Sequence, residues 1–458
     1  MAETIAAIAT GTSLSAIGII RISGDDAITV ADKVFKAISG IRLAEAESRK
    51  MYYGEITGID GGIIDLCLCT VSQGPGSYTG EDTAEFHCHG SPVVLSEILR
   101  ALFSHGVRQA EPGEFTKRAF LNGRMDLSQA EAVVDLIEAE TSAAAQNAAG
   151  QLRGAVGSRL ESVYSALLDI MAHFHALIDY PDEDIDDFEM QSYLPALRGT
   201  EKELEQLLST HERGMVLRNG IPTVIIGRPN TGKSSLLNAL LGYDRAIVTD
   251  ISGTTRDTIE EKILLGGVLL RLIDTAGLRK IDDPLEKLGV DRALAALREA
   301  KLIILVLDGS EPLRDEDYEA LRSVPPGVPR ITAVNKSDLP SVLGINELSE
   351  LEPEIKSCRV SALTGEGIET LGEEIKKLFP ELSSPSSGET ITSVRQAEAI
   401  SRAKVNIGLA IASISEMVTP DAVLTDIEAA ISAIGEITGK TMREDIISRI
   451  FERFCVGK

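Results

Sequence analysis

Tryptophan is absent from this chain, aromatic residues are scarce, and basic residues are too few to balance the acidic ones. Among 458 residues there is no Trp, 4% are aromatic, and 45 Lys and Arg stand against 70 Asp and Glu, which gives a formal net charge of −25. A protein that grips nucleic acid needs clustered Lys and Arg for its phosphate contacts. The deficit argues against a generic nucleic-acid-binding protein, unless a local patch or a partner supplies the positive charge.

Long hydrophobic runs are also absent. No stretch of 18 or more apolar residues occurs, and the longest candidates, such as Leu302–Leu307, have the length of a strand. The segment Met1–Gly11 lacks the basic start and the long apolar run of a signal peptide. We therefore expect a cytoplasmic protein with no membrane partner.

Cysteine is sparse. The five cysteines are an odd number and widely scattered, which excludes a disulfide framework. Cys67 and Cys69 alternate within the apolar run Ile63–Val71, so both are expected to point to one packed face. The triplet His87–His89 is followed by no second ligand pair at zinc-finger spacing, so it predicts no zinc site.

The length of the chain and the changes in its pattern indicate several domains. With 458 residues, of which 43% are hydrophobic and 25% charged, the chain is too long for one core, and about two to four domains are expected. The first part, to about residue 118, has the pattern of mixed strands and short helices. Strands are expected at Ile5–Thr10 and Ile17–Ile22, and helices at Ala27–Ile38 and Pro92–Phe103.

Helical periodicity follows this first part. Ser128 with Glu131 three residues later has the pattern of a capping box, and helical spacing continues from there to about Ile178. A second helical run covers Leu194–Leu217. Together these runs predict long packed helices that serve as a scaffold.

From residue 221 the pattern alternates between strand and helix. Short apolar strands are expected at Pro222–Ile226, Lys262–Leu265, Val268–Ile273, Leu302–Leu307 and Ile331–Val334. Helical segments between such strands are typical of a parallel sheet with crossover connections. A Ser- and Pro-rich linker at residues 380–390 ends this region, and helical character returns from residue 394 onward.

The segment Gly227–Ser234 (GRPNTGKS) fits the phosphate-loop motif GxxxxGK[ST]. It follows the expected strand Pro222–Ile226 and precedes the helical run Ser235–Leu241, which is the context that the motif requires. Backbone N–H groups of such a loop and the helix N-terminus bind phosphate oxygens. Lys233 would neutralise the β and γ phosphates, and the Ser234 hydroxyl would bind Mg²⁺.

Three further motifs follow the ends of expected strands. Asp274–Gly277 (DTAG) places a carboxylate for Mg²⁺ and a backbone N–H near the γ-phosphate. Asn335–Asp338 (NKSD) ends in a carboxylate that can accept two hydrogen bonds from guanine, which adenine cannot supply. Ser361–Leu363 (SAL) adds a backbone N–H for the guanine oxygen. Four motifs in this order predict a GTP-binding domain.

The group that drives hydrolysis is not evident from these motifs. Leu278 occupies the position where many small GTPases carry a Gln that orients the attacking water, and Leu cannot hydrogen-bond to water. Either the site is slow, or another group or ion stabilises the transition state. Asp282, Asp283 and Glu286 lie just downstream, and from the residues alone each is better interpreted as a solvated acid than as a catalyst.

Further motifs carry a resemblance to a known family. With Asp250–Asp257 (DISGTTRD), the motif set is similar to translation-factor-related GTPases, especially those activated by potassium. The flanking motifs narrow it: GIIRISG at 18–24, SYTGED at 77–82, PGEF at 112–115, AFLNGR at 119–124 and FCVGK at 454–458. With these the chain resembles, from end to end, the MnmE family of tRNA modification GTPases, also called TrmE.

The resemblance implies a multidomain α/β plus all-α protein. In it, a P-loop GTPase domain with a parallel-rich sheet and flanking helices is inserted into a helical domain, after an α+β domain of the folate-binding type. The implied parts are an N-terminal α+β dimerisation and folate domain at 1–118, the first part of the helical domain at 119–217, the GTPase domain at 218–380, and the second part of the helical domain with the C-terminal tail at 381–458.

The motifs and the resemblance together give a set of nucleotide and metal ligands. The residues expected to bind GTP are Asn230, Thr231, Gly232, Lys233, Ser234, Ser235, Thr249, Asp250, Ile251, Ser252, Gly253, Thr254, Thr255, Asp274, Thr275, Ala276, Gly277, Asn335, Lys336, Ser337, Asp338, Ser361, Ala362 and Leu363. By the resemblance, Mg²⁺ would be bound by Ser234 and Thr255, and K⁺ by Asn230, Thr249, Ile251 and Thr254. K⁺ would supply the charge that an arginine finger supplies elsewhere, and Glu286 would orient water as the catalytic residue once two GTPase domains meet across a dimer.

The resemblance also implies a folate site. Arg21, Glu85, Arg124 and Lys458 match positions associated with a tetrahydrofolate derivative, in the 5-formyl or 5,10-methylene form. Some members carry Lys in place of Arg124, and Arg's fork has a different geometry. Cys455, in the tail, is either a reactive thiol or, as we expect, a packed anchor.

The function implied is the addition of an aminomethyl or carboxymethylaminomethyl group to carbon 5 of the wobble uridine of tRNA. The chain would act as a homodimer with the FAD-containing protein MnmG, in a heterotetramer to which tRNA binds. The alternative is a regulatory switch GTPase of the ribosome-assembly type, which would have no need of the Arg21, Glu85 and Arg124 constellation.

Overall fold

The computed structural model describes residues 3–179, 190–243, 261–273, 295–344, 347–348, 356–383, 387–442, 444–452 and 454–457. The chain divides into two compact units. The first consists of Met1–Val134, Gly157–Leu197 and Val405–Lys458, and the second of Asp135–Val156 and Arg198–Lys404. Within the described ranges, no helix combines the length and the apolar character needed to cross a bilayer.

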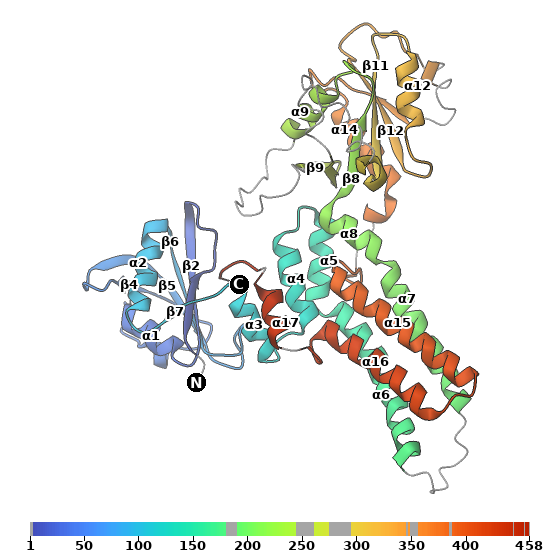
Figure 1. Cartoon of the computed structure of the whole chain (residues 1–458). Helices are drawn as coiled ribbons and strands as arrows, with labels where there is room; N and C mark the ends of the chain where they lie inside the picture. The colour runs from blue at the N-terminus through green and yellow to red at the C-terminus, as the bar shows by residue number, and fades with distance from the viewer. Residues whose placement is uncertain are drawn as a thin grey trace. The chain divides into compact units, whose positions relative to one another are not determined.

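A seven-stranded sheet forms the N-terminal part of the first unit, in the order β3-β4-β5-β6-β2-β1-β7 (Figure 1). Neighbouring strands are antiparallel except β1 and β7, which are parallel. The strands expected near residues 5 and 17 are confirmed as β1 and β2, the first two strands along the chain. The strands are β1 (Ile5–Ile8), β2 (Ser15–Ser23), β3 (Phe35–Ala37), β4 (Met51–Thr57), β5 (Ile63–Ser72), β6 (Thr83–Gly90) and β7 (Arg108–Gln109).

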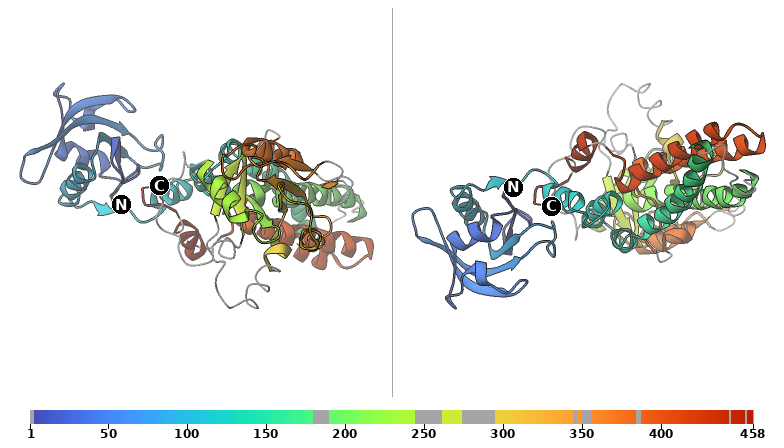
Figure 2. Two further views of the ribbon diagram at one scale, coloured as in Figure 1. Left: turned by 90° about the horizontal axis from the view of Figure 1, so that it is seen from above. Right: turned by 90° about the horizontal axis from the view of Figure 1, so that it is seen from below.

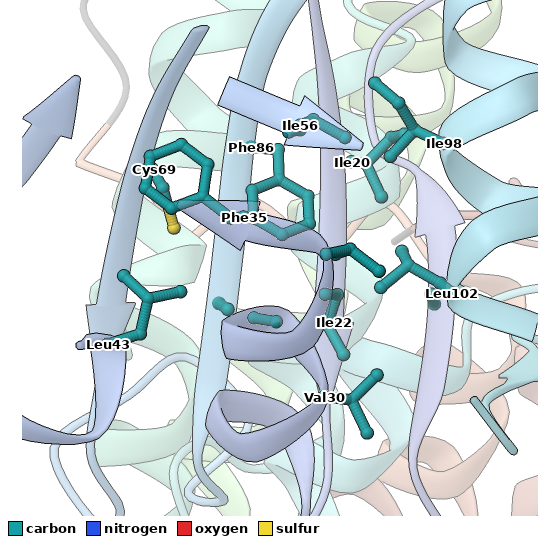
Figure 3. Close-up of a cluster of buried hydrophobic side chains, with 14 of the residues drawn as sticks. Ile20, Ile22, Val30, Phe35, Leu43, Ile56, Cys69, Phe86, Ile98 and Leu102 are labelled. Carbon is teal, nitrogen blue, oxygen red and sulfur yellow. The ribbon is translucent and has the colours of Figure 1, made fainter. Parts of the chain in front are cut away.

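Two helices, α1 (Ala27–Val34) and α2 (Pro92–Phe103), pack against this sheet. Because side chains alternate along a strand, β2 and β6 send every second residue into the core, among them Ile20 and Phe86. Figure 3 shows these side chains with Phe35, whose ring stacks on that of Phe86 at a centroid distance of 5.9 Å. The helix α2 has the bounds that its pattern predicts.

The structure confirms one expectation for this sheet and corrects another. Cys67 and Cys69 are both buried, as their alternation predicts. The helix expected over Ala27–Ile38 ends at Val34, because Phe35–Ala37 pairs with β4 as an edge strand. Ladder hydrogen bonds and the burial of Phe35 outweigh helical periodicity at this point.

The helical part of the first unit contains α3 (Glu114–Leu121), α6 (Ala155–Asp179), α16 (Pro420–Thr438) and α17 (Glu444–Phe451). Helices α6 and α16 run side by side in the views of Figure 2, and the carboxylate of Glu428 lies 3.4 Å from His175 between them. The return of helical character after residue 394 is thereby confirmed.

The start of α4 (Leu127–Ile137) corrects the predicted capping box. Asp126 Oδ1 accepts a hydrogen bond from the Gln129 backbone N–H at 2.8 Å, and the Asp126 N–H donates to Gln129 Oε1 at 2.9 Å. This reciprocal pair is a capping box, so the prediction for Ser128 and Glu131 is wrong. Ser128 lies inside the first turn and donates to Asp126 at 2.6 Å.

A six-stranded sheet forms the centre of the second unit, in the order β13-β12-β11-β8-β10-β9. Its pairs are parallel except for the edge strand β9, which is antiparallel to β10. Every residue of the central strand β11 is buried, as expected where helices cover both faces. The strands are β8 (Ile221–Ile226), β9 (Glu261–Leu265), β10 (Val268–Leu272), β11 (Leu302–Asp308), β12 (Arg330–Asn335) and β13 (Ser357–Arg359).

Helices surround this sheet and continue beyond it (Figure 1). Those with described bounds are α5 (Ser142–Leu152), α7 (Leu194–Ser209), α8 (His211–Asn219), α9 (Lys233–Tyr243), α12 (Asp315–Arg322), α14 (Ile368–Leu378) and α15 (Val394–Ser415). The alternation of strands and helices predicted from residue 221 is confirmed.

The end of the expected Ser- and Pro-rich linker is packed in the second unit. The Thr390 carbonyl accepts hydrogen bonds from the buried amides of Asn147, at 3.1 Å, and Gln151, at 2.5 Å. Thr392 donates to Asp135 at 2.6 Å. The chain that returns from the sheet is therefore fixed between helices by buried polar contacts.

Candidate nucleotide-binding site

The carboxyl ends of parallel strands bring three of the predicted motifs together in the second unit. The loop Gly227–Ser234 follows β8, the motif Asn335–Asp338 begins at the last residue of β12, and Ser361–Leu363 follows β13. Strands β8, β11, β12 and β13 are parallel, so these loops lie at one edge of the sheet. In open α/β sheets this edge is where ligands bind.

The phosphate-side loop has the backbone that its glycines predict. Asn230 and Gly232 have φ angles of 66° and 93°, which lie in the left-handed region. A Cβ atom on Gly232 would lie 2.2 Å from Asn335 Nδ2, so only glycine fits there. Lys233 begins α9, and its ammonium donates to the carbonyls of Gly227, at 2.8 Å, and Arg228, at 2.7 Å.

Asn335 joins the phosphate-side loop to the base-side loop. Its buried side chain donates from Nδ2 to the Thr231 carbonyl at 2.9 Å and accepts at Oδ1 from the Ala362 N–H at 3.0 Å. One amide therefore fixes three of the predicted motifs relative to one another.

The base-side loop contains an exposed carboxylate, that of Asp338, and a half-buried lysine, Lys336. The Ser361 hydroxyl donates to Asp338 Oδ1, which orients the exposed carboxylate that the sequence predicts for guanine recognition. Lys336 has a φ angle of 65° and its ammonium lies 2.6 Å from Asp308 Oδ2. Leu363, next to Ser361, is 85% exposed, which leaves an apolar side chain open beside the predicted base site.

Burial affects the pKa of the lysine in the phosphate-side loop. Desolvation lowers the pKa of Lys233, and the positive charge of Arg228 lowers it further. Polyphosphate beside Lys233 would oppose both effects, because an adjacent anion favours the charged form. Burial raises the pKa of Asp308, but hydrogen bonds from Lys336 and Ser310 outweigh it, and the pKa is lowered overall.

Of the remaining predicted ligands, some are described in the structure and others are not. Ser234 lies in the first turn of α9, and Ser235 beside it is exposed. Ser337, between Lys336 and Asp338, is half-buried. Glu286 and Lys458 lie outside the described residues, as do Thr249, Asp250, Ile251, Ser252, Gly253, Thr254, Thr255, Asp274, Thr275, Ala276 and Gly277.

A second cluster of predicted residues lies on the N-terminal sheet. Arg21 of β2 and Glu85 of β6 are cross-strand neighbours, and their side chains form an ion pair at 2.7 Å. The Arg21 guanidinium lies 5.1 Å from the ring centroid of Tyr78 and 5.7 Å from that of Phe115. Arg124 is exposed beside Gly80, of the same loop as Tyr78.

A partly buried ionic network near these residues was not predicted. Arg118 donates to Glu81 at 2.9 Å and to Glu114 at 2.9 Å, and Glu114 also accepts from Arg108. Ser23 donates to the same Glu81 oxygen at 2.7 Å. Glu81 and Glu114 fall inside the motifs SYTGED and PGEF, so the motifs contain the signal but not the pairing.

The tail at residues 454–457 packs on the N-terminal part of the first unit. Val456 forms an antiparallel bridge with Pro112, and the Gly113 N–H donates to the Cys455 carbonyl at 3.2 Å. Gly457 has a φ of 97°, and a Cβ there would lie 2.2 Å from the Ile8 carbonyl oxygen. The expectation that Cys455 is a packed anchor is wrong, because its side chain is exposed.

Comparison with known proteins identifies the family. The family model of the MnmE helical domain matches residues 127–455, and that of the GTP-binding protein TrmE N-terminus matches residues 4–124. The tRNA modification GTPase MnmE of Thermoanaerobacter sp. (strain X514) is 43% identical over 458 residues, which cover 100% of this chain and 99% of that protein. The protein of the same name from Bacillus velezensis is 42% identical over 459 residues and 100% of both chains.

Among solved structures, the G domain of the T. maritima FeoB iron transporter is 28% identical, over 35% of this chain and 98% of that one, with a TM-score of 0.25. The assignment rests on the sequence matches, which span both units. They agree with a multidomain protein that joins an α+β domain, helices and a P-loop domain. The chain therefore belongs to the MnmE family, and it is a GTP hydrolase that acts in tRNA modification.

Proposed function

We propose that this chain is a potassium-activated GTPase that works with an MnmG-type FAD protein to add an aminomethyl or carboxymethylaminomethyl group to carbon 5 of the wobble uridine of tRNA. A tetrahydrofolate derivative would donate the one-carbon unit. The observation that supports this best is that one chain combines an assembled nucleotide site, tied together by Asn335, with the Arg21–Glu85 cluster on its N-terminal sheet. Its place of action would be the cytoplasm.

For GTP, the described residues have suitable chemistry. The glycine-dependent loop and the N-terminus of α9 offer backbone N–H groups to phosphates. Lys233 brings a cation to the same loop, and Asp338 offers its carboxylate to guanine. We assign Mg²⁺ to the hydroxyls of Ser234 and Thr255, where it would neutralise phosphate charge.

For potassium, Asn230 carries the proposal. Its side chain is exposed on the phosphate-side loop, where its left-handed backbone is part of the turn. We assign the remaining ligands to Thr249, Ile251 and Thr254, and the orientation of water to Glu286. The ion would supply positive charge to the transition state, and Asn230 would hold it in place.

For the folate, the Arg21 region offers charge and aromatic surface together. The Arg21 guanidinium contacts a carboxylate and lies near two aromatic rings, and a flat heteroaromatic ring with amide-like edges fits such surroundings. Arg124 would hold an anionic part of the ligand. Gly457 approaches the Ile8 carbonyl of β1, and we assign the next residue, Lys458, to this site.

An exposed apolar face of the N-terminal sheet supports a homodimer. Met51, Tyr53, Leu66 and Leu68 point away from the core and are 44%, 52%, 43% and 39% exposed. Tyr53 and Leu68 are directly paired across β4 and β5. Such a face on a monomer marks a contact surface, and we assign it to a second copy of the chain. The parts 1–118, 119–217, 218–380 and 381–458 remain our proposed domains.

The first test is GTP turnover by the purified protein in KCl and in NaCl, with ATP as the control substrate. We expect strong stimulation by K⁺ and no turnover of ATP. Equal, slow rates in both salts would remove the potassium mechanism and leave Glu286 as a surface acid.

The second test is mass spectrometry of wobble nucleosides from a deletion strain. We expect the C5 modification to disappear and to return with the wild-type chain but not with an Arg21→Ala variant. Unchanged nucleosides would favour a regulatory switch GTPase of the ribosome-assembly type instead.

A further inference from the structure

Arg228 lies in the phosphate-side loop, at a position that the motif leaves open, and yet it is 7% exposed. Its guanidinium donates from Nε to Asp317 Oδ2 at 3.2 Å and from Nη2 to Glu311 Oε2 at 2.8 Å. The Asp317 side chain is 3% exposed, so this pair is removed from water. Removal of one partner of a buried ion pair strongly destabilises the fold, because the other charge is left unpaired.

The Arg228 side chain carries its positive charge despite its burial. Burial lowers the pKa of Arg228, but the hydrogen bond to Glu311 and the negative charge of Asp317 outweigh it and raise the pKa. Arginine stays protonated in proteins in any case. The phosphate-side loop therefore presents a charged guanidinium to the side chains of Asp317 and Glu311.

Asp317 also belongs to the start of α12. Its Oδ2 accepts a second hydrogen bond, from the Arg314 backbone N–H at 3.0 Å, which caps the helix. The same oxygen thus fixes both the helix N-terminus and the Arg228 side chain. Movement of the phosphate-side loop relative to α12 would break the Arg228–Asp317 ion pair, whereas the capping contact within α12 would remain.

The backbone of Arg228 acts on the lysine of the motif. Its carbonyl accepts from Lys233 Nζ at 2.7 Å and from the Thr231 hydroxyl at 3.1 Å. A side chain held by α12 therefore fixes the carbonyl that holds Lys233.

Glu311 and Asp317 belong to residues 308–317, which we call the acidic segment. This segment also holds the base-side loop. Asp308, at the end of β11, is 4% exposed and binds the Lys336 ammonium at 2.6 Å. Ser310 donates to the other carboxylate oxygen of Asp308 at 2.6 Å. One short segment between β11 and α12 thus binds a cation from each side of the predicted nucleotide site, Arg228 from one loop and Lys336 from the other.

We propose that Arg228 is a positioning residue for nucleotide binding, and that the acidic segment 308–317 holds the phosphate-side and base-side loops in the binding arrangement before nucleotide arrives. This inference rests on the proposed nucleotide site and adds a residue pair, Arg228 and Asp317, that no motif assigns. Preorganisation of this kind lowers the cost of binding and acts on affinity.

The test measures dissociation constants of the full chain for GDP and for a non-hydrolysable GTP analogue by calorimetry. Arg228→Met and Asp317→Asn are each expected to raise both dissociation constants by about tenfold or more. The double variant should bind nucleotide no more weakly than the weaker-binding single variant, because the two substitutions remove the same contact. Arg228→Lys keeps the charge without the two-pronged geometry and should lie in between.

Steady-state kinetics separates positioning from a general loss of structure. Nucleotide binding restores the loop at saturation, so KM for GTP should rise while kcat stays within about twofold. Arg322→Met is the matched control, because Arg322 is an exposed arginine in the last turn of α12, outside the segment 308–317. It should leave both constants unchanged.

Lys233→Ala is the reference for the site itself. If it binds nucleotide like the wild type, the proposed site is wrong. If it loses binding while folded Arg228→Met and Arg228→Lys keep the wild-type constants, the site stands and the positioning role is overturned. Should Asp317→Asn fail to fold, the two Arg228 variants still decide the question.

Discussion

Discrimination between guanine and other bases depends on one carboxylate in this chain. Asp338 is exposed, and the Ser361 hydroxyl orients it. In Asp338→Asn an acceptor oxygen is replaced by an NH₂ donor, which would face the guanine N–H groups. GTP affinity should fall by roughly 100-fold, while xanthosine triphosphate, with a carbonyl where guanine has its amine, should bind better than to the wild type.

Competition binding with the two triphosphates checks this prediction. Glu369→Gln, at the start of α14, is the control, because it changes an acid of the same domain outside the predicted site. Equal loss of both ligands in Asp338→Asn would mean that the substitution disrupts the loop and does not alter recognition.

Thiol chemistry should also be confined to one residue. Cys455 is exposed, whereas Cys67, Cys69, Cys88 and Cys358 are buried. Burial raises the pKa of Cys358 to about 12, so at pH 8 its reactive thiolate is negligible in the folded chain. Ellman's reagent should therefore titrate one thiol rapidly, and Cys455→Ser should abolish that phase.

The same shift has a consequence for stability. Burial holds the pKa of Cys358 in the folded chain above the ordinary value for a thiol, about 9. Its protonated form is favoured by folding, so its contribution is complete below about pH 9 and is lost as the pH rises toward 12. In the labelling experiment with Ellman's reagent, fast reaction of more than one thiol at pH 8 would contradict the burial of the other four cysteines.

At the scale of elements, the start of α4 depends on Asp126. Asp126→Ala removes the side-chain half of the capping box with Gln129, so the free energy of unfolding should fall by about 1 kcal/mol. Urea unfolding of the full chain, followed by circular dichroism, measures it. Glu131→Ala, at the position that the sequence pattern favoured, should have a smaller effect, and the reverse order would contradict the capping assignment.

The elements show what sequence patterns can and cannot reveal. Periodicity correctly predicted α2 and the parallel strands β8, β10, β11 and β12, because a helix face or a fully buried strand has a local signature. It missed the end of α1, where pairing of Phe35–Ala37 with a distant strand decides the conformation. It also placed the capping box two residues late, since Asp126 and Ser128 both suit an N-cap and only the fold selects between them.

In the candidate site, too, local motifs could be predicted and long-range contacts could not. Motif spacing indicated Lys233 and Asn335, and the structure places both where strand ends meet. The contacts of Arg228 with Asp317, 89 positions apart, have no sequence signature. Likewise Cys455 lies in a motif, but its exposure depends on which neighbour in the tail, here Phe454, enters the core.

At the scale of the whole molecule, the net charge of −25 bears on how tRNA is bound. A chain this acidic has few phosphate contacts to offer, so we expect an MnmG-type partner to provide most of the basic surface. Filter binding at physiological salt should show weak retention of tRNA by this chain alone and firm retention by the complex. Tight binding by the chain alone would contradict this division of roles.

The tail links the two extremes of the sequence, and Gly457 is the residue on which that contact depends. Its φ of 97° and the 2.2 Å approach of a Cβ to the Ile8 carbonyl oxygen leave no room for a side chain. Gly457→Ala should therefore displace the tail and weaken folate binding by about tenfold or more, if the tail completes the proposed site. GTP turnover should persist, because the predicted nucleotide loops belong to the other unit.

Fluorescence titration with 5-formyltetrahydrofolate measures the effect. Gly61→Ala is the matched control, since Gly61 also has a positive φ, 77°, but no atom lies within 4 Å of its added Cβ. Backbone strain is common to both variants, so a loss of folate affinity in Gly457→Ala alone must come from the collision with β1. Equal affinities in the two variants would place the folate elsewhere and leave the tail as a structural element of the first unit.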